Sequence, residues 1–296
     1  MTNHIAALAR IPDDQMADLR RKDTAKGLLH LALYICLIAL TGTAIALGVP
    51  FWWALLPVHG ILLTFLFTLE HECTHQTPFA SPTLSDRVGH ACGLVLIIPF
   101  TWFRYFHLAH HRHTNDPERD PELAHGAKPK TTLGLALHLT GLRYWRAIMS
   151  QFVTNMRGQA RADYLPASAL PRITREARIM GVIYTAAALS LFWTPILLWL
   201  WVVPMILGQP FLRLYLLAEH HRLPYVANML ENTRTTYTNR VIRFLAWNMP
   251  YHAEHHAAPQ VPFHQLPKLN ALLQADLKAT ADGYVDFTAE ELRQLR

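Results

Sequence analysis

The stretch "GLLHLALYICLIALTGTAIALGV" (residues 27–49) decides the fold class, since it contains no Lys, Arg, Asp or Glu. About 20 helical residues are enough to cross the roughly 30 Å apolar core of a bilayer, so this stretch predicts a membrane span. Residues 51–69 form a second stretch of the same kind. Residues 179–212 are also apolar and are interrupted near Thr194 and Pro195, which predicts a short third span and a fourth.

The composition of the whole chain favours a membrane protein with sizeable extramembrane parts. Of its 296 residues, 51% are hydrophobic and only 16% are charged, which is unusual for a soluble domain. Buried core helices of a soluble protein are the alternative interpretation of such apolar stretches. Pro50 and Pro195 each stand between two spans, so we expect two membrane hairpins.

Positive charge is distributed so that all of it can lie on one side of the membrane. None of the 27 Lys and Arg residues falls within 27–69 or 179–212. The positive-inside rule makes the side that carries these charges cytoplasmic. The formal net charge of +6 favours contact with anionic lipid headgroups or with an acidic soluble partner. Because the Lys and Arg residues are dispersed, the sequence argues against a nucleic-acid partner.

We expect one domain, 1–296, because no internal repeat or low-complexity linker divides the chain. Its predicted parts are a cytoplasmic N-terminal segment (1–26), a region with both membrane hairpins (27–217) and a cytoplasmic C-terminal part (218–296). Residues 1–26 mix charges of both signs and lack the apolar core of a secretory signal, which predicts an interfacial helix. The predicted fold is an all-α membrane protein with four transmembrane helices in two hairpins and a cytoplasmic helical cap that carries clustered histidines.

The histidines are concentrated in three motifs that this topology places on the cytoplasmic side: "HECTH" (71–75), "HLAHH" (107–111) and "HAEHH" (252–256). A spacing of four residues puts both imidazoles of the first motif on one helical face. The second and third motifs share the spacing His-x-x-His-His, which brings three rings together across about one turn. "AEHHR" (218–222) adds two more histidines at the cytoplasmic end of the fourth span.

Imidazoles in this number and spacing are typical of a metal site, for which Fe, Zn, Cu and Ni are suitable ions. One zinc ion takes three or four ligands, whereas the three motifs offer eight and His220 a ninth, which suits two ions. The nine candidate ligands are His71, His75, His107, His110, His111, His220, His252, His255 and His256. Neighbouring carboxylates are expected to accept hydrogen bonds from the distal ring nitrogens and so fix the tautomers. These carboxylates are Glu70, Glu72, Asp116, Asp120, Glu219 and Glu254.

The motifs, in this order around two hairpins, resemble the membrane fatty acid desaturase and hydroxylase superfamily. The resemblance extends over roughly 28–273 and rests on "HECTH", "HLAHHRHTNDPERDPE" and "YHAEHHAAPQVPFHQLP". It implies that the histidines bind a non-haem di-iron centre at the cytosolic ends of four transmembrane helices. "AEHHR" is similar to an element of membrane alkane hydroxylases that makes His220 the ninth ligand, although Leu216 stands where some relatives carry Asn. "ENTRTT" (231–236) is similar to the bacterial lipid-modifying branch.

The resemblance implies an integral membrane oxidoreductase of the bacterial inner membrane, with its termini and active site facing the cytoplasm. The expected reaction is the O2-dependent desaturation or hydroxylation of an unactivated C–H bond in a fatty acyl chain, and the lipid or acyl substrate is expected to enter from the bilayer. Since the sequence contains no haem-binding or iron–sulfur motif, electrons are expected from a separate ferredoxin, rubredoxin or cytochrome.

Three alternatives stay open at this point. Carotenoid ketolases and hydroxylases of the same superfamily share the histidine pattern, so a polyene could be the substrate. A His-rich membrane metal transporter is the non-enzyme alternative, although only His30 and His59 lie within a predicted span. A zinc hydrolase of lipids would use the same ligand chemistry. Seven other histidines are expected to be structural: His4, His30, His59, His90, His125, His138 and His264.

Overall fold

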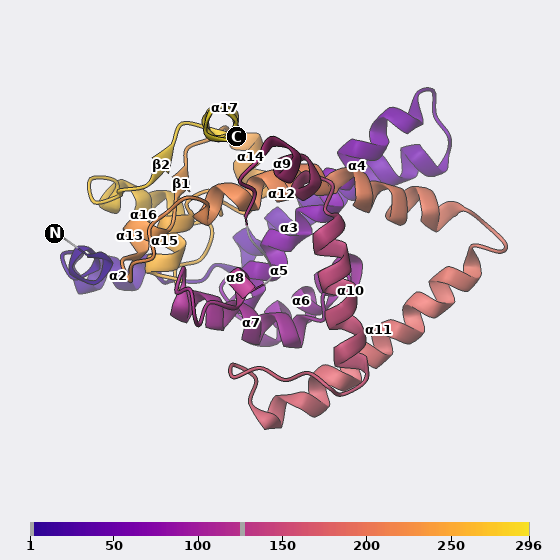
Figure 1. Ribbon diagram of the computed structural model, residues 1–296, viewed down its shortest axis with the longest axis horizontal. Helices are drawn as coiled ribbons and strands as arrows, with labels where there is room; N and C mark the ends of the chain where they lie inside the picture. Colours follow the sequence, from indigo (N-terminus) through magenta and orange to yellow (C-terminus); the bar gives the residue numbers. More distant parts are fainter. Residues whose placement is uncertain (1–2, 125–127, 296) are drawn as a thin grey trace.

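The computed structural model describes residues 3–124 and 128–295, which are mostly helical (Figure 1). The α-helices are α1 (His4–Leu8), α2 (Asp13–Leu19), α3 (Thr24–Ala46), α4 (Leu55–Thr64), α5 (Leu66–Thr74), α6 (Pro82–Leu96), α7 (Phe100–His113), α8 (Pro121–Ala124), α9 (Thr132–Leu139), α10 (Leu142–Met156), α11 (Leu170–Ser190), α12 (Val203–His220), α13 (Met229–Asn232), α14 (Arg240–Leu245), α15 (His252–Ala257), α16 (Leu266–Leu273) and α17 (Tyr284–Gln294). Short helical turns of other types are η1 (Trp52–Ala54), η2 (Ala167–Ala169) and the π-helical η3 (Leu198–Val202). Two short strands, β1 (Thr235–Thr236) and β2 (Thr280–Ala281), pair in parallel.

Three helical segments of the described chain are long and apolar enough to cross a membrane: Asp13–Ala46, Trp52–Thr74 and Leu198–His220. They contain α3, α4 with α5, and η3 with α12, and they correspond to the predicted first, second and fourth spans. Helices α6 and α7 meet at an angle of 100° and make a fourth candidate if a bent pair counts as one span. The predicted third span falls in α11 and is not among the three. The first half of α11 carries Arg172, Arg175, Glu176 and Arg178, so only its second half is apolar.

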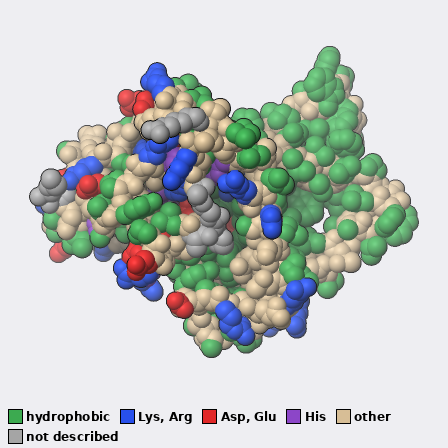
Figure 2. Space-filling model, viewed as in Figure 1, with side chains coloured by type: hydrophobic (Ala, Val, Ile, Leu, Met, Phe, Trp, Pro, Cys, Tyr) green, Lys and Arg blue, Asp and Glu red, His purple; other side chains and the backbone are tan. Residues whose placement is uncertain are grey.

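The two turns between apolar segments lie at the same end of the molecule, on the right in Figure 1. Hydrophobic side chains cover this end in Figure 2, whereas Lys and Arg gather over the rest of the visible face. Large apolar side chains at the turns are strongly exposed, including Phe51 (74%), Phe192 (84%) and Trp193 (81%). Apolar surface on this scale is unfavourable in water and suits contact with lipid. The chain is therefore an integral membrane protein.

Close backbone contact joins the second apolar segment to the last one. A Cβ atom at Gly60 would lie 2.2 Å from the carbonyl oxygen of Pro204, and one at Gly208 would lie 2.2 Å from the carbonyl oxygen of Gly60. Only glycine allows α4 and α12 to approach this closely, as small residues do at helix contacts in membranes. The contact holds the ends of α5 and α12 in a fixed relation, and both ends carry histidines.

The C-terminal part of the chain folds as a compact cap over these helix ends. Beneath α15, the side chains of Trp247, Met249, Leu266 and Leu269 are fully buried and form part of the largest hydrophobic core. The N-terminal helix α1 lies against this cap, where the backbone N–H of His4 donates a hydrogen bond to the side chain of Asn228 (2.9 Å). The apolar core beneath α15 fixes the third histidine motif against the first two.

Candidate metal centre

The nine predicted ligands all come together at one place, at the ends of α5, α7 and α12 and along α15. Eight of them are buried, and His75 is partly exposed. They form two groups, each with one nitrogen per ring within 4.8 Å of the others. We call these the five-histidine group (His71, His75, His107, His111 and His255) and the three-histidine group (His110, His220 and His256). The ninth ring, His252, places its Nε2 3.2 Å from Nε2 of His220 and so adjoins the three-histidine group.

Helical periodicity explains how the motifs are divided between the groups. Residues four apart share a face, whereas neighbouring residues diverge by about 100°. His107 and His111 therefore face the five-histidine group, and His110 faces the other. In α15, His252 and His256 point together while His255 points to the five-histidine group. Motifs two and three therefore each contribute rings to both groups.

Within the five-histidine group, ring nitrogens approach one another directly. Nε2 of His71 lies 2.7 Å from Nε2 of His255, and Nε2 of His75 lies 2.9 Å from Nε2 of His107. Both nitrogens of His111 are buried without a hydrogen-bond partner among the described residues. Burial, together with the neighbouring imidazoles, lowers the pKa of His255 well below its usual value, so the ring is neutral and one of its nitrogens has a lone pair for a metal. Neutral imidazoles converging on one point without acceptors are suited to a cation.

The three-histidine group is surrounded by more polar contacts. Nδ1 of His110 donates to the carboxylate of Asp120 (2.9 Å), which leaves Nε2 facing the other rings. Nδ1 of His220 lies 3.2 Å from the carbonyl oxygen of Asn232, and Nδ1 of His256 lies 3.1 Å from the hydroxyl of Thr114. Such partners fix the tautomer and the orientation of a ligating ring.

Asn232, within the "ENTRTT" segment, joins three parts of the chain at this group. Its side-chain amide donates to the carbonyl oxygens of Thr114 (3.1 Å) and Val226 (2.7 Å), and its own carbonyl oxygen accepts from the side chain of Asn115 (2.8 Å). Asn232 is fully buried. It therefore connects the end of α7 to the loop that follows α12.

The carboxylates near the motifs fulfil the predicted role only in part. Asp120 holds His110, and Glu219 lies 3.5 Å from Nδ1 of His252. The other four carboxylates do not contact the histidine motifs: three of them accept hydrogen bonds from other groups, and one has no partner among the described residues. Glu72 accepts from the backbone N–H of Phe263, Glu254 from Thr235 and Asn270, and Asp116 from Arg119, while Glu70 is buried without a partner among the described residues.

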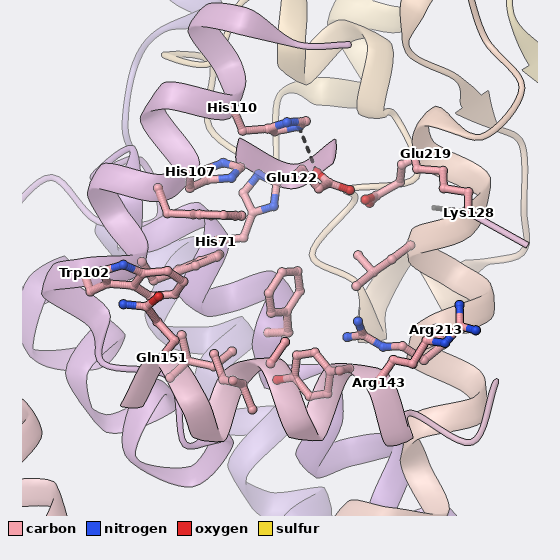
Figure 3. A pocket seen from close by; sticks show the side chains of 18 of the residues that line it. His71, Trp102, His107, His110, Glu122, Lys128, Arg143, Gln151, Arg213 and Glu219 are labelled. Carbon is pink, nitrogen blue, oxygen red and sulfur yellow. Dashed lines mark ion pairs between the residues drawn. The ribbon is translucent and has the colours of Figure 1, made fainter. Parts of the chain in front are cut away.

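Glu122 is a site residue that the sequence analysis missed. Its Oε2 lies 3.3 Å from Nε2 of His110 (Figure 3), the same nitrogen that lies 3.3 Å from Nε2 of His220. The signal was present in "DPERDPE", since Glu122 follows Asp120 by two residues in a turn that brings both carboxylates to one ring. The three-histidine group thus has a carboxylate within reach, a ligand type that iron and zinc both accept.

Four of the histidines expected to be structural, His4, His30, His59 and His90, have hydrogen-bond partners away from the centre. His59 contacts the hydroxyl of Thr41 (2.7 Å) and the carbonyl oxygen of Leu200 (3.1 Å), and His30 contacts the carbonyl oxygen of Phe244 (2.9 Å). His125 lies outside the described residues. These contacts satisfy imidazoles inside apolar segments and leave them no role at the centre.

His221 points away from its neighbour His220. Its Nε2 lies 3.1 Å from the carboxylate of Glu291, which also pairs with Arg222 (3.0 Å). Glu291 is almost fully buried and Arg222 is more exposed, so a half-buried ion pair ties α17 to the end of α12. His221 is therefore separated from the metal-binding groups, as expected from the divergence of adjacent helical residues.

A cavity of about 240 Å³ opens beside the two groups. His71, His107, His110 and His252 form one wall of it, and the other walls come from α7, α10 and α12 (Figure 3). Much of its surface is apolar, with side chains of Phe67, Ile98, Trp102, Phe103, Phe106, Ala147, Ile148 and Leu216. A mostly apolar cavity with a few polar groups is the usual form of a small-molecule site.

The donor set fits two transition-metal ions. Five imidazoles exceed the number that one tetrahedral ion needs, and three imidazoles with His252 and Glu122 nearby make a second mixed set. The buried, partnerless nitrogens of His111 and Nε2 of His256 are the groups that an ion would satisfy. The arrangement can hold metal next to an apolar ligand.

Comparisons with known proteins agree with this geometry. Residues 48–288 match the fatty acid desaturase family. The sn-1 oleoyl-lipid 12-desaturase of Arthrospira platensis is 24% identical over 279 residues, covering 83% of this chain and 75% of the relative. The sn-1 oleoyl-lipid 12-desaturase of a Picosynechococcus species is 36% identical over 85 residues, covering 28% of this chain and 24% of the relative. The chloroplastic omega-6 fatty acid desaturase of Spinacia oleracea is 24% identical over 244 residues, covering 75% of this chain and 54% of the relative.

Proposed function

Because the chain belongs to the fatty acid desaturase family, we propose that it is an O2-dependent oxidase that introduces a double bond into the acyl chain of a membrane lipid. The observation that carries the proposal is that buried imidazoles of both groups form a wall of a largely apolar cavity. The proposed metal is iron, two ions per chain, with the nine histidines as ligands. Bound iron would supply the activation of O2 needed to attack an unactivated C–H bond.

The residues of the chain would position the ligands and the substrate. Asp120 holds the Nδ1 proton of His110 and keeps Nε2 directed inward, and Asn232 does the same for His220 through its carbonyl oxygen. The aromatic side chains of Trp102, Phe103 and Phe106 line the cavity and would hold an acyl chain against the ligand wall. Their apolar surface would also exclude water from the reacting carbon.

The choice of desaturation over hydroxylation is supported by the relatives, which are named as oleoyl-lipid or fatty acid desaturases. Neither the histidine groups nor the cavity separates the two outcomes, because both begin with removal of one hydrogen from the chain. Hydroxylation is therefore the competing result of the test below.

We also propose that the centre faces the cytoplasm of a bacterial inner membrane and receives electrons from a separate acidic protein. The support is the distribution of charge: residues 27–69 and 179–212, with the turns between apolar segments, carry no Lys or Arg, and the formal net charge of the whole chain is +6. An acidic ferredoxin or rubredoxin would be attracted to such a face, and a cytochrome is the other candidate.

A single-turnover experiment tests the reaction without knowledge of the donor. The purified protein is loaded with iron in phospholipid nanodiscs, reduced with dithionite, freed of reductant and exposed to O2. Mass spectrometry of the lipids should show acyl chains that have lost two hydrogens in an amount close to that of the protein. Gain of one oxygen would establish hydroxylation instead. An unchanged lipid with normal iron content, or equal product with zinc in place of iron, would contradict the proposal.

A further inference from the structure

Basic side chains line one end of the cavity, and the histidine centre gives no reason for their presence there. Arg143 of α10 and Arg213 of α12 line this end, whereas Lys128 lies by Glu219, nearer the histidines (Figure 3). Trp102 and Gln151 lie at the opposite end. The cavity therefore has an apolar end and a cationic end, with the histidine wall between them.

Arg213 is the unusual member of this cationic end because it lies within an apolar membrane segment, Leu198–His220. Its Nε and Nη2 atoms are buried and have no hydrogen-bond partner among the described residues. The guanidinium stacks on the ring of Tyr144, 4.0 Å from its centre. No carboxylate of the described chain lies within ion-pair distance of Arg213, although Glu122 and Glu219 line the same cavity nearer the histidines.

A charge in such a position is costly and marks a functional site when no partner within the protein accounts for it. A planar guanidinium binds carboxylate and phosphate groups through two parallel hydrogen bonds. The stacking on Tyr144 holds the plane of Arg213 while leaving its edge free for such a ligand. The missing partner is therefore expected to be an anion that enters the cavity.

We propose that Arg213, with Arg143, binds the anionic group at the head of an acyl substrate, a lipid phosphate or a carboxylate. This inference rests on the proposed oxidation of an acyl chain and names the part of the substrate that is recognised. The head is fixed at the cationic end, and the chain runs past the histidine wall toward Trp102. The carbon that reacts is thus set by its distance from the head group rather than from the methyl end.

A neutral substrate would leave the cationic end without a partner. A polyene hydrocarbon or a free alkane carries no group that could accept hydrogen bonds from Arg213, and its binding would keep a charge buried and unpaired. The cationic end of the cavity therefore favours an anionic amphiphile over the carotenoid alternative.

Equilibrium binding tests this inference without turnover. Native mass spectrometry of the iron-loaded, oxidised protein is used to compare dioleoyl phosphatidylglycerol, oleate and oleyl alcohol, which share a chain and differ in the head. Arg213→Gln should weaken binding of the anionic ligand about tenfold or more, as loss of a charge-assisted hydrogen bond implies, and leave oleyl alcohol within twofold. Loss for phosphatidylglycerol alone identifies the phosphate as the ligand, and loss for oleate alone identifies the carboxylate.

Two further variants control for loss of structure. Arg146→Gln removes an exposed arginine of α10 that does not line the cavity, and it should change none of the affinities. Arg213→Lys keeps the charge and should recover part of the binding of the anionic ligand. Iron content equal to that of the unchanged protein shows that the fold is intact. An equal loss for all three ligands, or none for either anion, would overturn the subsite, whereas absence of turnover with normal anion binding would reject only the proposed reaction.

Discussion

The five-histidine group and the three-histidine group differ in what holds the ring nitrogens that face away from the centre. In the three-histidine group, Asp120, Thr114 and the carbonyl oxygen of Asn232 each hold one Nδ1. In the five-histidine group, Nδ1 of His255 and both nitrogens of His111 have no hydrogen-bond partner within the described chain. The ring orientations in the three-histidine group therefore depend on loop residues. Those in the five-histidine group depend on the packing of α5, α7 and α15 and on the number of rings. Two sites a few ångströms apart should therefore respond differently to substitution.

The largest expected effect comes from removing a ring where few are present. His220→Ala should reduce iron from about two per chain to about one and abolish lipid oxidation, because the three-histidine group loses a central member. His221→Ala is the matched control, since that ring contacts Glu291 and not the centre, and it should retain both irons and part of the activity. The measurements are the iron content of each variant and its yield of oxidised lipid. Normal iron with normal turnover in His220→Ala would exclude this residue from the centre.

A smaller effect is expected from removing a hydrogen-bond partner of a ligand. Asp120→Asn should weaken iron binding at the three-histidine group by about 10- to 100-fold, because His110 loses the carboxylate that orients it. Iron binding at the five-histidine group should not change, so a titration should show one tight and one weakened site. Asp116→Asn lies in the same loop without touching a histidine and serves as the control. Equal weakening of both sites would remove the distinction between the groups.

The ion pair between α17 and the end of α12 should contribute more to the stability of the fold than to the binding of metal. Glu291→Ala leaves the buried His221 and the more exposed Arg222 without their shared partner and should lower the free energy of unfolding by about 2 kcal/mol, as loss of a hydrogen bond to a charged group does. Thermal unfolding in detergent measures the loss. Glu290→Ala, at an exposed neighbouring position, should show no resolvable change. If Glu291→Ala instead lost iron selectively at the three-histidine group, His221 would belong to the support of that group.

The smallest predicted effect lies at the start of α7, which supplies rings to both groups. Glu176 accepts hydrogen bonds from the backbone N–H groups of Phe100 (2.8 Å) and Thr101 (3.0 Å) and from His90 (2.7 Å). Glu176→Gln should lower stability by about 1 kcal/mol at pH 7, as loss of a helix N-cap does, and affect both iron sites equally.

The same carboxylate gives a pH dependence of known sign. Burial alone would raise the pKa of Glu176, but the hydrogen bonds from His90 and Thr101 outweigh it and lower the pKa. Its stabilisation is therefore present above the ordinary carboxyl pKa of about 4.3 and is lost as the pH falls through the lowered value. The difference in melting temperature between Glu176→Gln and the unchanged protein should disappear in that range. A difference that grows with acidity would show that Glu176 is not the capping anion.

Much of the centre could be predicted from the sequence because its ligands come in short motifs. Spacings of three and four identify rings on common helical faces, and the nine predicted histidines do come together. Their division into two groups was not predictable, since it depends on how α7 and α15 are rotated against α5 and α12. Glu122 and Asn232 were missed because the loops after α7 and α12 turn back to bring each of them to a histidine near it in the chain, and residue spacing does not predict the conformation of a loop.

The membrane spans and the cationic end of the cavity were likewise only partly predictable from the sequence. Hydropathy located three of the apolar segments correctly, but α11 is half basic and does not satisfy the criterion for the predicted third span. Arg213 is the only charged residue in "LGQPFLRLYLL" (207–217), but hydropathy alone does not indicate its significance. Its significance depends on its place in a cavity that Arg143 also lines, which only the folded chain reveals.

The order of the ligands along the chain sets the order in which the protein can mature. Four members of the five-histidine group, His71, His75, His107 and His111, precede residue 112, and they need only α5 and α7 to meet. The other group has a single ring, His110, until translation passes His220. Since a chain is synthesised from its N-terminus, an emerging polypeptide can capture its first ion long before its second site exists. If the two groups bind iron as proposed, a species with one ion would be a stage of biosynthesis, and cells short of metal would accumulate it with an intact membrane fold and without the proposed activity.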